Sequence, residues 1–385
     1  MKKEKNIIIV GGHRYDYHPG GTYHLARKFT EHGYRVAYIS YFLSPFHWLF
    51  SENKKELLKR FSVWLKGGEW FNDKRIWSYV PFTFLPIYNK PMLRSSWVMK
   101  NTHRLTIPPF MKVLKKHGFH DVDILWLDSP LYGFVLDTIS HKKSIIRLFD
   151  DSFFLQSTPD TFLRREKEVI ERTDVVISLS HDLIRKYKKI SNREMTYFPG
   201  GVDTDFFFKG SDELPVEYKN IPSPRIVCLG GLTSPHLFDK ELMHYIAKKI
   251  PDASFVFIGE SKDDITKISN LPNTYFLGHH PYSKIPQYLK NADVGIIPYK
   301  LSPQTDRLGA DLLKLYEYAA CGLPVVSLKF KEFENVDTAA YLAKNYEEYA
   351  QLLIAAIQKK DQNRFLEYAK ANSWEKRFEE LLSLL

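Results

Sequence analysis

The stretch "GADLLKLYEYAACGLPVVS" (residues 309–327) joins a helical pattern to the start of an apolar strand pattern. Lys314 and Glu317 are three positions apart, so on a helix their side chains emerge from one face. A Cys-Gly-Leu-Pro turn at residues 321–324 then ends the helix. Because this spacing is also common in surface salt bridges, the surrounding sequence has to show whether the pair marks a site.

Short β-branched runs recur on both sides of this stretch, at intervals long enough for helices. In the first half they are residues 6–12, 34–41, 122–129, 143–151 and 174–180. In the second half they are residues 225–231, 253–260, 274–279, 294–299 and 323–328. This rhythm is typical of βαβ units, and it restarts after a proline-flanked linker near residues 200–222. We therefore predict an α/β protein with two doubly wound parallel-sheet domains, residues 1–200 and residues 201–365.

The bulk composition agrees with two domains and adds a charge asymmetry. A chain of 385 residues exceeds what one core usually serves. Residues 1–200 contain 33 Lys+Arg and 20 Asp+Glu, whereas residues 201–385 contain 22 and 25. A basic half of this kind favours a polyanionic partner, either nucleic acid or an acidic lipid surface. No nucleic-acid motif occurs, so we expect no nucleic acid.

Two further features of the sequence exclude some classes of protein. Cys228 and Cys321 each lie inside an apolar run, which argues for a reducing compartment and against a disulfide framework. No uninterrupted apolar stretch of about 18 residues occurs, so we expect no membrane-spanning helix. The short apolar run after the basic N-terminus is typical of a first strand rather than of a signal sequence.

Residues 42–120 interrupt the βαβ rhythm and interleave aromatic with basic side chains. On a helix, Leu57, Leu58, Phe61 and Leu65 would share one side, with lysines on the others. Such a basic amphipathic helix can lie in a membrane interface. The alternative is an ordinary helix packed on its own sheet with a solvated basic face. Both interpretations remain open at this point.

The stretch "DLLKLYEYAACGLPVVS" resembles the nucleotide-sugar motif of GT-B glycosyltransferases, in which a K-x-x-E helix precedes A-x-G-x-P-V-V. "FPGGVDTDFF" (198–207), "YLKNADVGIIPY" (288–299) and "NSWEKRFEELL" (372–382) resemble further parts of that family in the same order. Similar proteins include the bacterial xanthan glucuronosyltransferase and teichuronic acid glycosyltransferases. The resemblance implies the GT-B fold, two Rossmann-like domains facing a cleft, with a helix at residues 366–385 returning to the first domain.

The resemblance also implies a set of donor-binding residues. Lys314 would meet the donor diphosphate, Glu317 the ribose, and Tyr299 would border the diphosphate. Four further positions would flank the nucleotide: Gly231, Leu232, His279 and His280. The two histidines have no acidic partner at ligand spacing and the family generally needs no metal, so we expect neither a metal site nor another cofactor.

This sequence departs from the family pattern at a position that matters for catalysis. The first glutamate of the E-x7-E pair of many retaining members falls at Gly309, which favours an inverting transfer with a general base. Asp150 aligns with the proposed catalytic aspartate of the xanthan enzyme, and Asp151 is its rival, although it could instead cap a helix. His13 is a third candidate for the base.

The loop "GGHRYDYHPGGTYHLAR" (11–27) is the expected acceptor site. Its glycines permit close approach and its charged side chains offer polar contacts to an acceptor sugar or its pyrophosphate. The residues assigned to this role are Arg14, Asp16, Gly20 and Gly21. The loop contains no G-x-G-x-x-G, so a dinucleotide cofactor is not expected.

The sequence therefore predicts an inverting glycosyltransferase that moves a sugar from a UDP-sugar to a lipid-linked or polysaccharide acceptor. Glucuronate is the first sugar to test. We expect a cytoplasmic protein peripherally associated with the anionic inner face of the cell membrane. Two alternatives remain: a nucleotide-sugar 2-epimerase, and a non-catalytic membrane-docking protein with the same fold.

Overall fold

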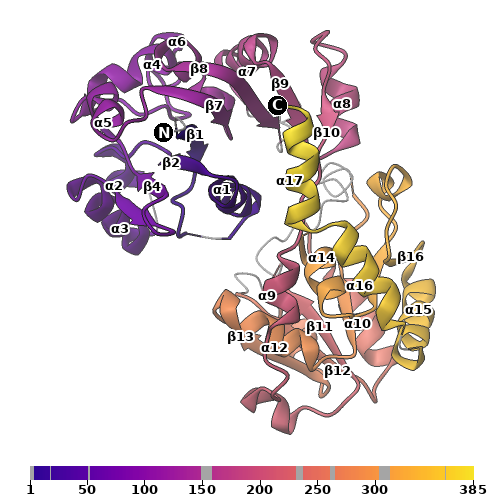
Figure 1. Ribbon diagram of the computed structural model, residues 1–385. Helices are drawn as coiled ribbons and strands as arrows, with labels where there is room; N and C mark the ends of the chain where they lie inside the picture. The colour runs from indigo at the N-terminus through magenta and orange to yellow at the C-terminus, as the bar shows by residue number, and fades with distance from the viewer. Residues whose placement is uncertain are drawn as a thin grey trace. The chain divides into compact units, whose positions relative to one another are not determined.

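The computed structural model describes residues 4–17, 19–50, 53–148, 158–230, 237–260, 265–302, 313–359 and 361–385. The chain divides into two compact units, each a parallel sheet flanked by helices (Figure 1). Unit 1 contains residues 1–179, 183–198 and 378–385, and unit 2 contains residues 180–182 and 199–377. The main change of unit thus falls between Phe198 and Pro199.

Unit 1 is built on an eight-stranded sheet in the order β10-β9-β8-β7-β1-β2-β4-β3. Every pairing is parallel except that of β3 with β4. The strands are β1 Lys5–Gly12, β2 Tyr34–Ser40, β3 Glu69–Phe71, β4 Ile76–Tyr79, β7 Asp121–Leu127, β8 Ser140–Leu148, β9 Val175–Ser178 and β10 Thr196–Tyr197. A separate antiparallel pair is formed by β5 Phe82–Thr83 and β6 Thr106–Ile107.

The α-helices that begin in the first half of the chain are α1 Gly21–Glu31, α2 Phe46–Phe50, α3 Lys54–Leu65, α4 Ser96–Asn101, α5 Phe110–Lys116, α6 Val135–Thr138, α7 Asp160–Arg172 and α8 His181–Tyr187. Helix α1 follows β1 and packs beside β2, which makes the first βαβ unit. Asn53 and Ser95 cap α3 and α4 by accepting hydrogen bonds from Glu56 N and Val98 N.

Unit 2 is built on a six-stranded, wholly parallel sheet in the order β13-β12-β11-β14-β15-β16. The strands are β11 Arg225–Leu229, β12 Ser254–Ile258, β13 Thr274–Gly278, β14 Val294–Ile297, β15 Val325–Leu328 and β16 Tyr341–Ala343. The α-helices are α9 Thr204–Phe208, α10 Lys240–Lys249, α11 Thr266–Ser269, α12 Ile285–Lys290, α14 Leu313–Ala320, α15 Tyr346–Gln358, α16 Gln362–Ala371 and α17 Trp374–Ser383.

The sheet of unit 2 is buried on both faces. On β11, Val227 and Leu229 belong to one hydrophobic cluster, while Ile226 and Cys228 belong to another. This alternation follows from the two-residue period of a strand. Continuous apolar runs are required where helices cover both faces of a parallel sheet, which is why the strands could be recognised in the sequence.

Helix α17 is shared by the two units. In unit 2, Trp374 N donates to Val202 O at 3.0 Å. In unit 1, the Phe378 ring packs edge-on against Phe29, with centroids 4.9 Å apart, and against His32 at 4.5 Å. The residues of α17 from Phe378 onward thus belong to unit 1, and those before it to unit 2.

The segment at residues 42–120 does more than form one amphipathic helix. Strand β4 pairs with β2 and extends the main sheet. On α3, Leu57 is buried at 2% exposure, whereas Leu58 is 62% and Leu65 65% exposed. The expectation that these leucines share one side was therefore wrong, because Leu57 faces the core. None of the helices in the described part of the chain has the length and apolar character needed to cross a membrane.

Candidate functional site

The first candidate site is centred on Lys314, at the start of the described part of α14. Its ammonium nitrogen is buried, lies 4.5 Å from the centroid of the Tyr299 ring, and makes no hydrogen bond with the described residues. Tyr299 follows β14 and is itself buried. Burial acts to lower the pKa of Lys314, but Tyr299, Cys228 and Glu317 outweigh burial and leave that pKa above its ordinary value. The group is therefore a buried cation at neutral pH.

Glu317 lies one turn further along α14. Its Oε1 accepts a hydrogen bond from the Tyr282 hydroxyl at 2.8 Å, and burial raises the pKa of its carboxyl group. The Tyr282 ring stacks on Phe206, with centroids 5.1 Å apart. The hydrogen bond ties α14 to the segment that follows β13. Lys314 and Glu317 are thus not a solvated pair bonded to one another.

Helix α14 is fixed to the sheet by Tyr318, the residue after Glu317. The Tyr318 hydroxyl accepts from Leu229 N at 2.7 Å and donates to Ile296 O at 3.3 Å. Its ring lies over Gly295, where an added Cβ would come within 2.6 Å of the ring. Tyr318 was not predicted from the sequence, although a lone glycine inside an apolar strand signals such a close approach. This anchoring sets the position of Lys314 relative to the strand ends.

Three neighbouring strands of unit 2 end in glycine. Gly230 after β11, Gly259 after β12 and Gly278 at the end of β13 have φ of +50°, +149° and +71°. Gly230 N donates to Ile258 O at 2.7 Å, and Gly259 N donates to Gly278 O at 2.8 Å. A Cβ on Gly259 would lie 3.0 Å from Gly230 Cα. Close backbone packing therefore requires glycine at this edge, the edge at which parallel α/β sheets bind ligands.

Of the four remaining predicted donor-binding residues, the structure describes two histidines and does not describe the other two. His279 is exposed, and a ring nitrogen of His280 lies 3.1 Å from the Tyr288 hydroxyl. Both follow Gly278 and precede Tyr282, so they belong to the segment that is tied to α14. Gly231 and Leu232 lie outside the described residues. Within the described ranges, no group of three His, Cys, Asp or Glu side chains could hold a metal ion.

In unit 1, the predicted acceptor residues Arg14 and Asp16 are bonded within the protein. The Arg14 guanidinium is buried and donates to Asp16, and its Nε and Nη2 each lie 3.2 Å from a Glu56 carboxylate oxygen. Lys59 bonds Asp16 at 2.6 Å. Burial acts to raise the pKa of Asp16, but Lys59 and Arg14 hold it below its ordinary value. These contacts join the loop after β1 to α3.

The other unit 1 candidates are placed as follows. His13 is exposed and stacks on Tyr17, with centroids 4.8 Å apart, and meets Tyr41 edge-on at 5.6 Å. Gly20 is the N-cap of α1 and Gly21 its first residue. His13 and Arg14 line a cavity of about 200 Å³ that also includes Tyr17 and Tyr41. Asp150 and Asp151 lie outside the described residues.

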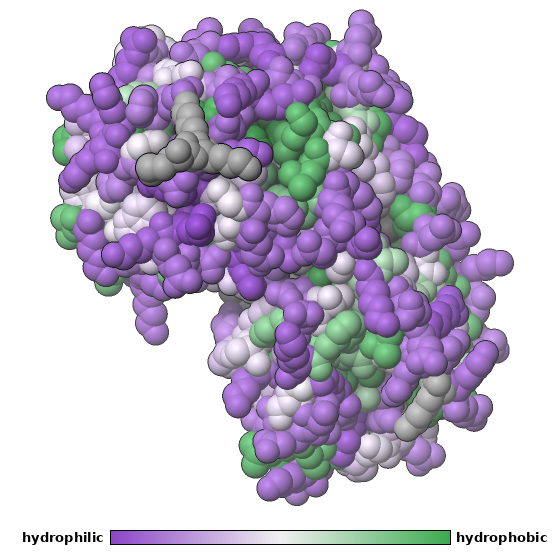
Figure 2. Space-filling view, in the orientation of Figure 1, coloured by the Kyte–Doolittle hydropathy of each residue, from purple (hydrophilic) through white to green (hydrophobic). Residues whose placement is uncertain are grey.

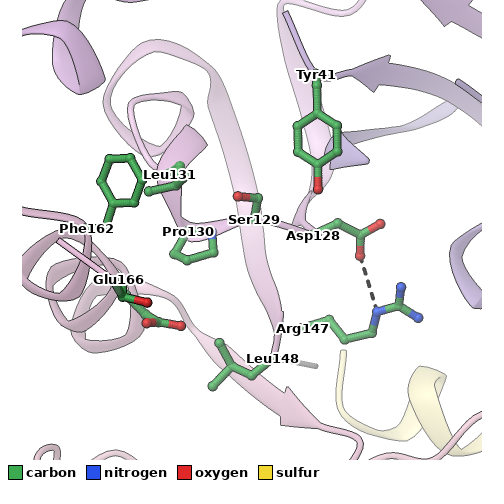
Figure 3. A pocket seen from close by; sticks show the side chains of 10 residues that line it. Tyr41, Asp128, Ser129, Pro130, Leu131, Arg147, Leu148, Phe162 and Glu166 are labelled. Atoms are coloured by element: carbon green, nitrogen blue, oxygen red, sulfur yellow. Dashed lines mark ion pairs between the residues drawn. The ribbon is translucent and has the colours of Figure 1, made fainter. Parts of the chain in front are cut away.

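A second cavity in unit 1, of about 180 Å³, was not anticipated from the sequence. Figure 3 shows Asp128 and Arg147 facing one another, with 3.2 Å between Oδ1 and Nε. Asp128 also accepts from the Thr22 hydroxyl at 2.6 Å and from Trp126 Nε1 at 2.9 Å. Tyr41 and Glu166 line other parts of the cavity (Figure 3). The available signal was an acid, Asp128, directly after the buried strand β7.

Comparisons with known proteins agree with this geometry. The family model "Glycosyl transferases group 1" matches residues 223–359. TuaH of Bacillus subtilis (strain 168), named as a teichuronic acid biosynthesis glycosyltransferase, is 29% identical over 171 residues. That alignment covers 42% of this chain and 42% of TuaH, so the match spans less than half of either protein.

Solved structures resemble the whole chain. Sucrose-phosphate synthase from Thermosynechococcus elongatus has a TM-score of 0.67 at 15% identity and covers 99% of this chain and 98% of its own. Anabaena HepE in complex with UDP and glucose has a TM-score of 0.64 at 15% identity, with 98% of both chains covered. TarM has a TM-score of 0.61 at 14% identity, with 100% of this chain and 99% of TarM covered.

These likenesses define a protein of the GT-B fold, as the sequence predicted. Residues 223–359, which contain the Lys314 site, are the part of the chain that is similar to the glycosyl transferases group 1 family.

Proposed function

We propose that the protein is a glycosyltransferase that takes its sugar from a UDP-linked donor. The observation that carries this proposal is the buried ammonium group of Lys314 beside the ends of the unit 2 strands, which makes no hydrogen bond with the part of the chain that the structure describes. Burying a charge without a partner costs several kcal/mol, so a fold that retains one usually supplies it to a ligand. A diphosphate, with two anionic groups, is the ligand that satisfies it best.

The neighbouring groups fit the rest of such a donor. The Glu317 carboxylate, held by Tyr282, can accept hydrogen bonds from the ribose hydroxyls. Glycines at the strand ends, which have no side chain, allow phosphate oxygens to approach the backbone closely. HepE, which has the same fold, was solved with UDP and with UDP-glucose. We assign the diphosphate to Lys314 and the ribose to Glu317.

The acceptor and the catalytic base belong to unit 1 in this proposal. An inverting transfer needs a base at the acceptor hydroxyl as the anomeric carbon is attacked, and the leaving UDP takes the bonding electron pair. Asp150 is the first candidate, with Asp151 and His13 as alternatives. TuaH is named for teichuronic acid biosynthesis, which supports a cell-envelope polymer or its lipid-linked precursor as acceptor. The basic charge of residues 1–200 supports work at the inner membrane face.

A ligand screen tests the donor assignment first. A bound ligand stabilises the native state according to its concentration and affinity, so Tm should rise with UDP and with the correct UDP-sugar. UDP-glucuronate and UDP-glucose are compared with ADP- and GDP-sugars, with wild type beside Lys314→Ala. We expect a UDP-dependent rise that Lys314→Ala lacks. Equal shifts with all nucleotides would contradict the assignment.

Incubation with the donor alone then separates transfer from epimerisation. A transferase leaves the UDP-sugar unchanged, apart from slow hydrolysis, until an acceptor is added. A nucleotide-sugar 2-epimerase produces a new sugar epimer without any acceptor, which NMR detects. Binding of UDP with neither reaction would support a non-catalytic protein of the same fold.

A further inference from the structure

Unit 1 contains a long segment without any acidic residue. Residues 74–120 include nine Lys+Arg and no Asp or Glu. The segment covers β4, the small sheet of β5 and β6, and helices α4 and α5. A run of this length without a carboxylate creates a local positive potential that internal ion pairs within the segment cannot cancel.

The same segment lines an apolar groove of about 660 Å³. Its walls are formed by Phe46, Leu85, Lys90, Pro91, Met92, Leu93, Ser95, Trp97 and Val98. Lys90 is the one charged residue in this set. A cavity of this size is within the range of sites for small molecules, but its lining offers few polar groups to orient a polar ligand.

Large apolar side chains project at the rim of this groove. Met92 is 85% exposed, Trp97 58% and Leu49, on neighbouring α2, 74%. Met92 has a left-handed φ of 66° at the tip of a turn in which Ser95 N donates to Met92 O at 3.2 Å. Figure 2 shows hydrophobic atoms in green at the margin of unit 1 where Figure 1 draws α2 and α5. The surface therefore presents Met92 and Trp97 outward rather than folding them into the core.

We propose that this surface, named here the 46–98 rim, docks on a lipid bilayer that contains anionic lipid. Met92 and Trp97 enter the acyl boundary, and Lys90 and Arg94 lie at the headgroups. Charge complementarity favours an anionic bilayer over a second copy of the chain as the partner of this surface. A second copy would bring two positively charged surfaces together, whereas an acidic bilayer carries the opposite charge. The inference rests on the proposed transfer to a lipid-linked acceptor and names the part of unit 1 that meets the lipid.

Vesicle flotation tests the proposal with the full-length protein. We expect binding to vesicles of phosphatidylcholine with 30% phosphatidylglycerol, weaker binding to pure phosphatidylcholine, and loss of affinity with added salt. Lys90→Gln and Arg94→Gln should each weaken binding about fivefold, the equivalent of about 1 kcal/mol per cation near the surface. Met92→Ser with Trp97→Ser should reduce it by at least tenfold.

Matched variants in unit 2 control for general loss of charge or apolarity. Lys219→Gln with Lys248→Gln, and Leu214→Ser with Val216→Ser, alter exposed residues of the same types and should leave vesicle binding unchanged. Brominated lipid should quench a part of the tryptophan fluorescence that Trp97→Phe removes. This signal reports insertion directly and does not depend on the fold tolerating two serines.

Three outcomes would overturn the proposal. Wild type could fail to float with anionic vesicles, or the rim and control variants could bind equally. Concentration-dependent dimerisation that Trp97→Ser abolishes, without vesicle binding, would instead assign the rim to a second copy. UDP binding is measured on the same samples, so that failure of the docking surface is distinguished from failure of the donor assignment.

Discussion

The Lys314 ammonium nitrogen lies 4.5 Å from the centroid of the Tyr299 ring, and this ring is the close partner that the described residues offer to that charge. A desolvated cation over an aromatic face gains about 2 kcal/mol. Tyr299→Leu should therefore lower the free energy of unfolding by about 2 kcal/mol, and Tyr299→Phe by less than about 1 kcal/mol. Urea denaturation measures both, and equal losses would show that the ring face is not the stabilising group.

The ion pair between Arg14 and Glu56 should stabilise the fold of unit 1. Arg14 is buried and both of its contacts with Glu56 are 3.2 Å long. Glu56→Gln removes the charge that faces a buried guanidinium, so unit 1 should lose about 2 kcal/mol, less than for a fully buried pair because Glu56 is partly exposed. Glu31→Gln breaks an exposed pair with Lys28 and should cost less than about 0.5 kcal/mol. Chemical denaturation compares the two variants, and a similar small loss in both would contradict this account.

Gly259 should tolerate no side chain. Its φ is +149°, and a Cβ would lie 3.0 Å from Gly230 Cα. Gly259→Ala should cost about 3 kcal/mol through strain and displacement of the neighbouring backbone. Gly33 has φ +84° with nothing within 4 Å of an added Cβ, so Gly33→Ala should cost about 1 kcal/mol. A smaller loss for Gly259→Ala than for Gly33→Ala, measured by thermal unfolding, would show that the strand ends are not packed this closely.

His103 should make unit 1 sensitive to acid. Burial, reinforced by Arg104, lowers the pKa of His103 from its ordinary value of 6.5 to about 4. The unfolded chain therefore binds a proton that the folded chain rejects, and stability is lost as pH falls from about 6.5 to about 4. The loss is at most about 3 kcal/mol. His103 stacks on Phe134, with centroids 4.7 Å apart, so His103→Phe keeps the ring and should flatten this pH dependence.

The measurement for His103 is the free energy of unfolding at pH 9, 8, 7, 6, 5 and 4 in both proteins. Above pH 7 the two curves should run parallel. An unchanged slope between pH 6.5 and 4 in His103→Phe would assign the acid sensitivity to other groups, of which His47 is the first candidate, since burial also lowers its pKa to about 4.

Much of the fold could be predicted because most of its main strands are buried apolar runs, whereas β13 is only partly buried. Strand β4 could not, because "IWSY" is four residues long and carries no period that distinguishes a strand from a buried turn. The resemblance assigned Lys314 and Tyr299 to one donor site, but it did not predict their direct contact. The hydrogen bond of Tyr282 with Glu317 was not predicted either, since it joins residues 35 positions apart. Neither was the Asp128–Arg147 pair, which depends on two strands ending side by side.

The central claim is that Lys314 holds the diphosphate of the donor, and calorimetric titration of UDP tests it most directly. Removal of a buried, charge-assisted contact should raise Kd by at least about 30-fold, or about 2 kcal/mol, in Lys314→Ala. The matched control, Lys248→Ala on the exposed face of α10, should bind UDP like wild type. A folded Lys314→Ala protein with the Kd of wild type would contradict the account.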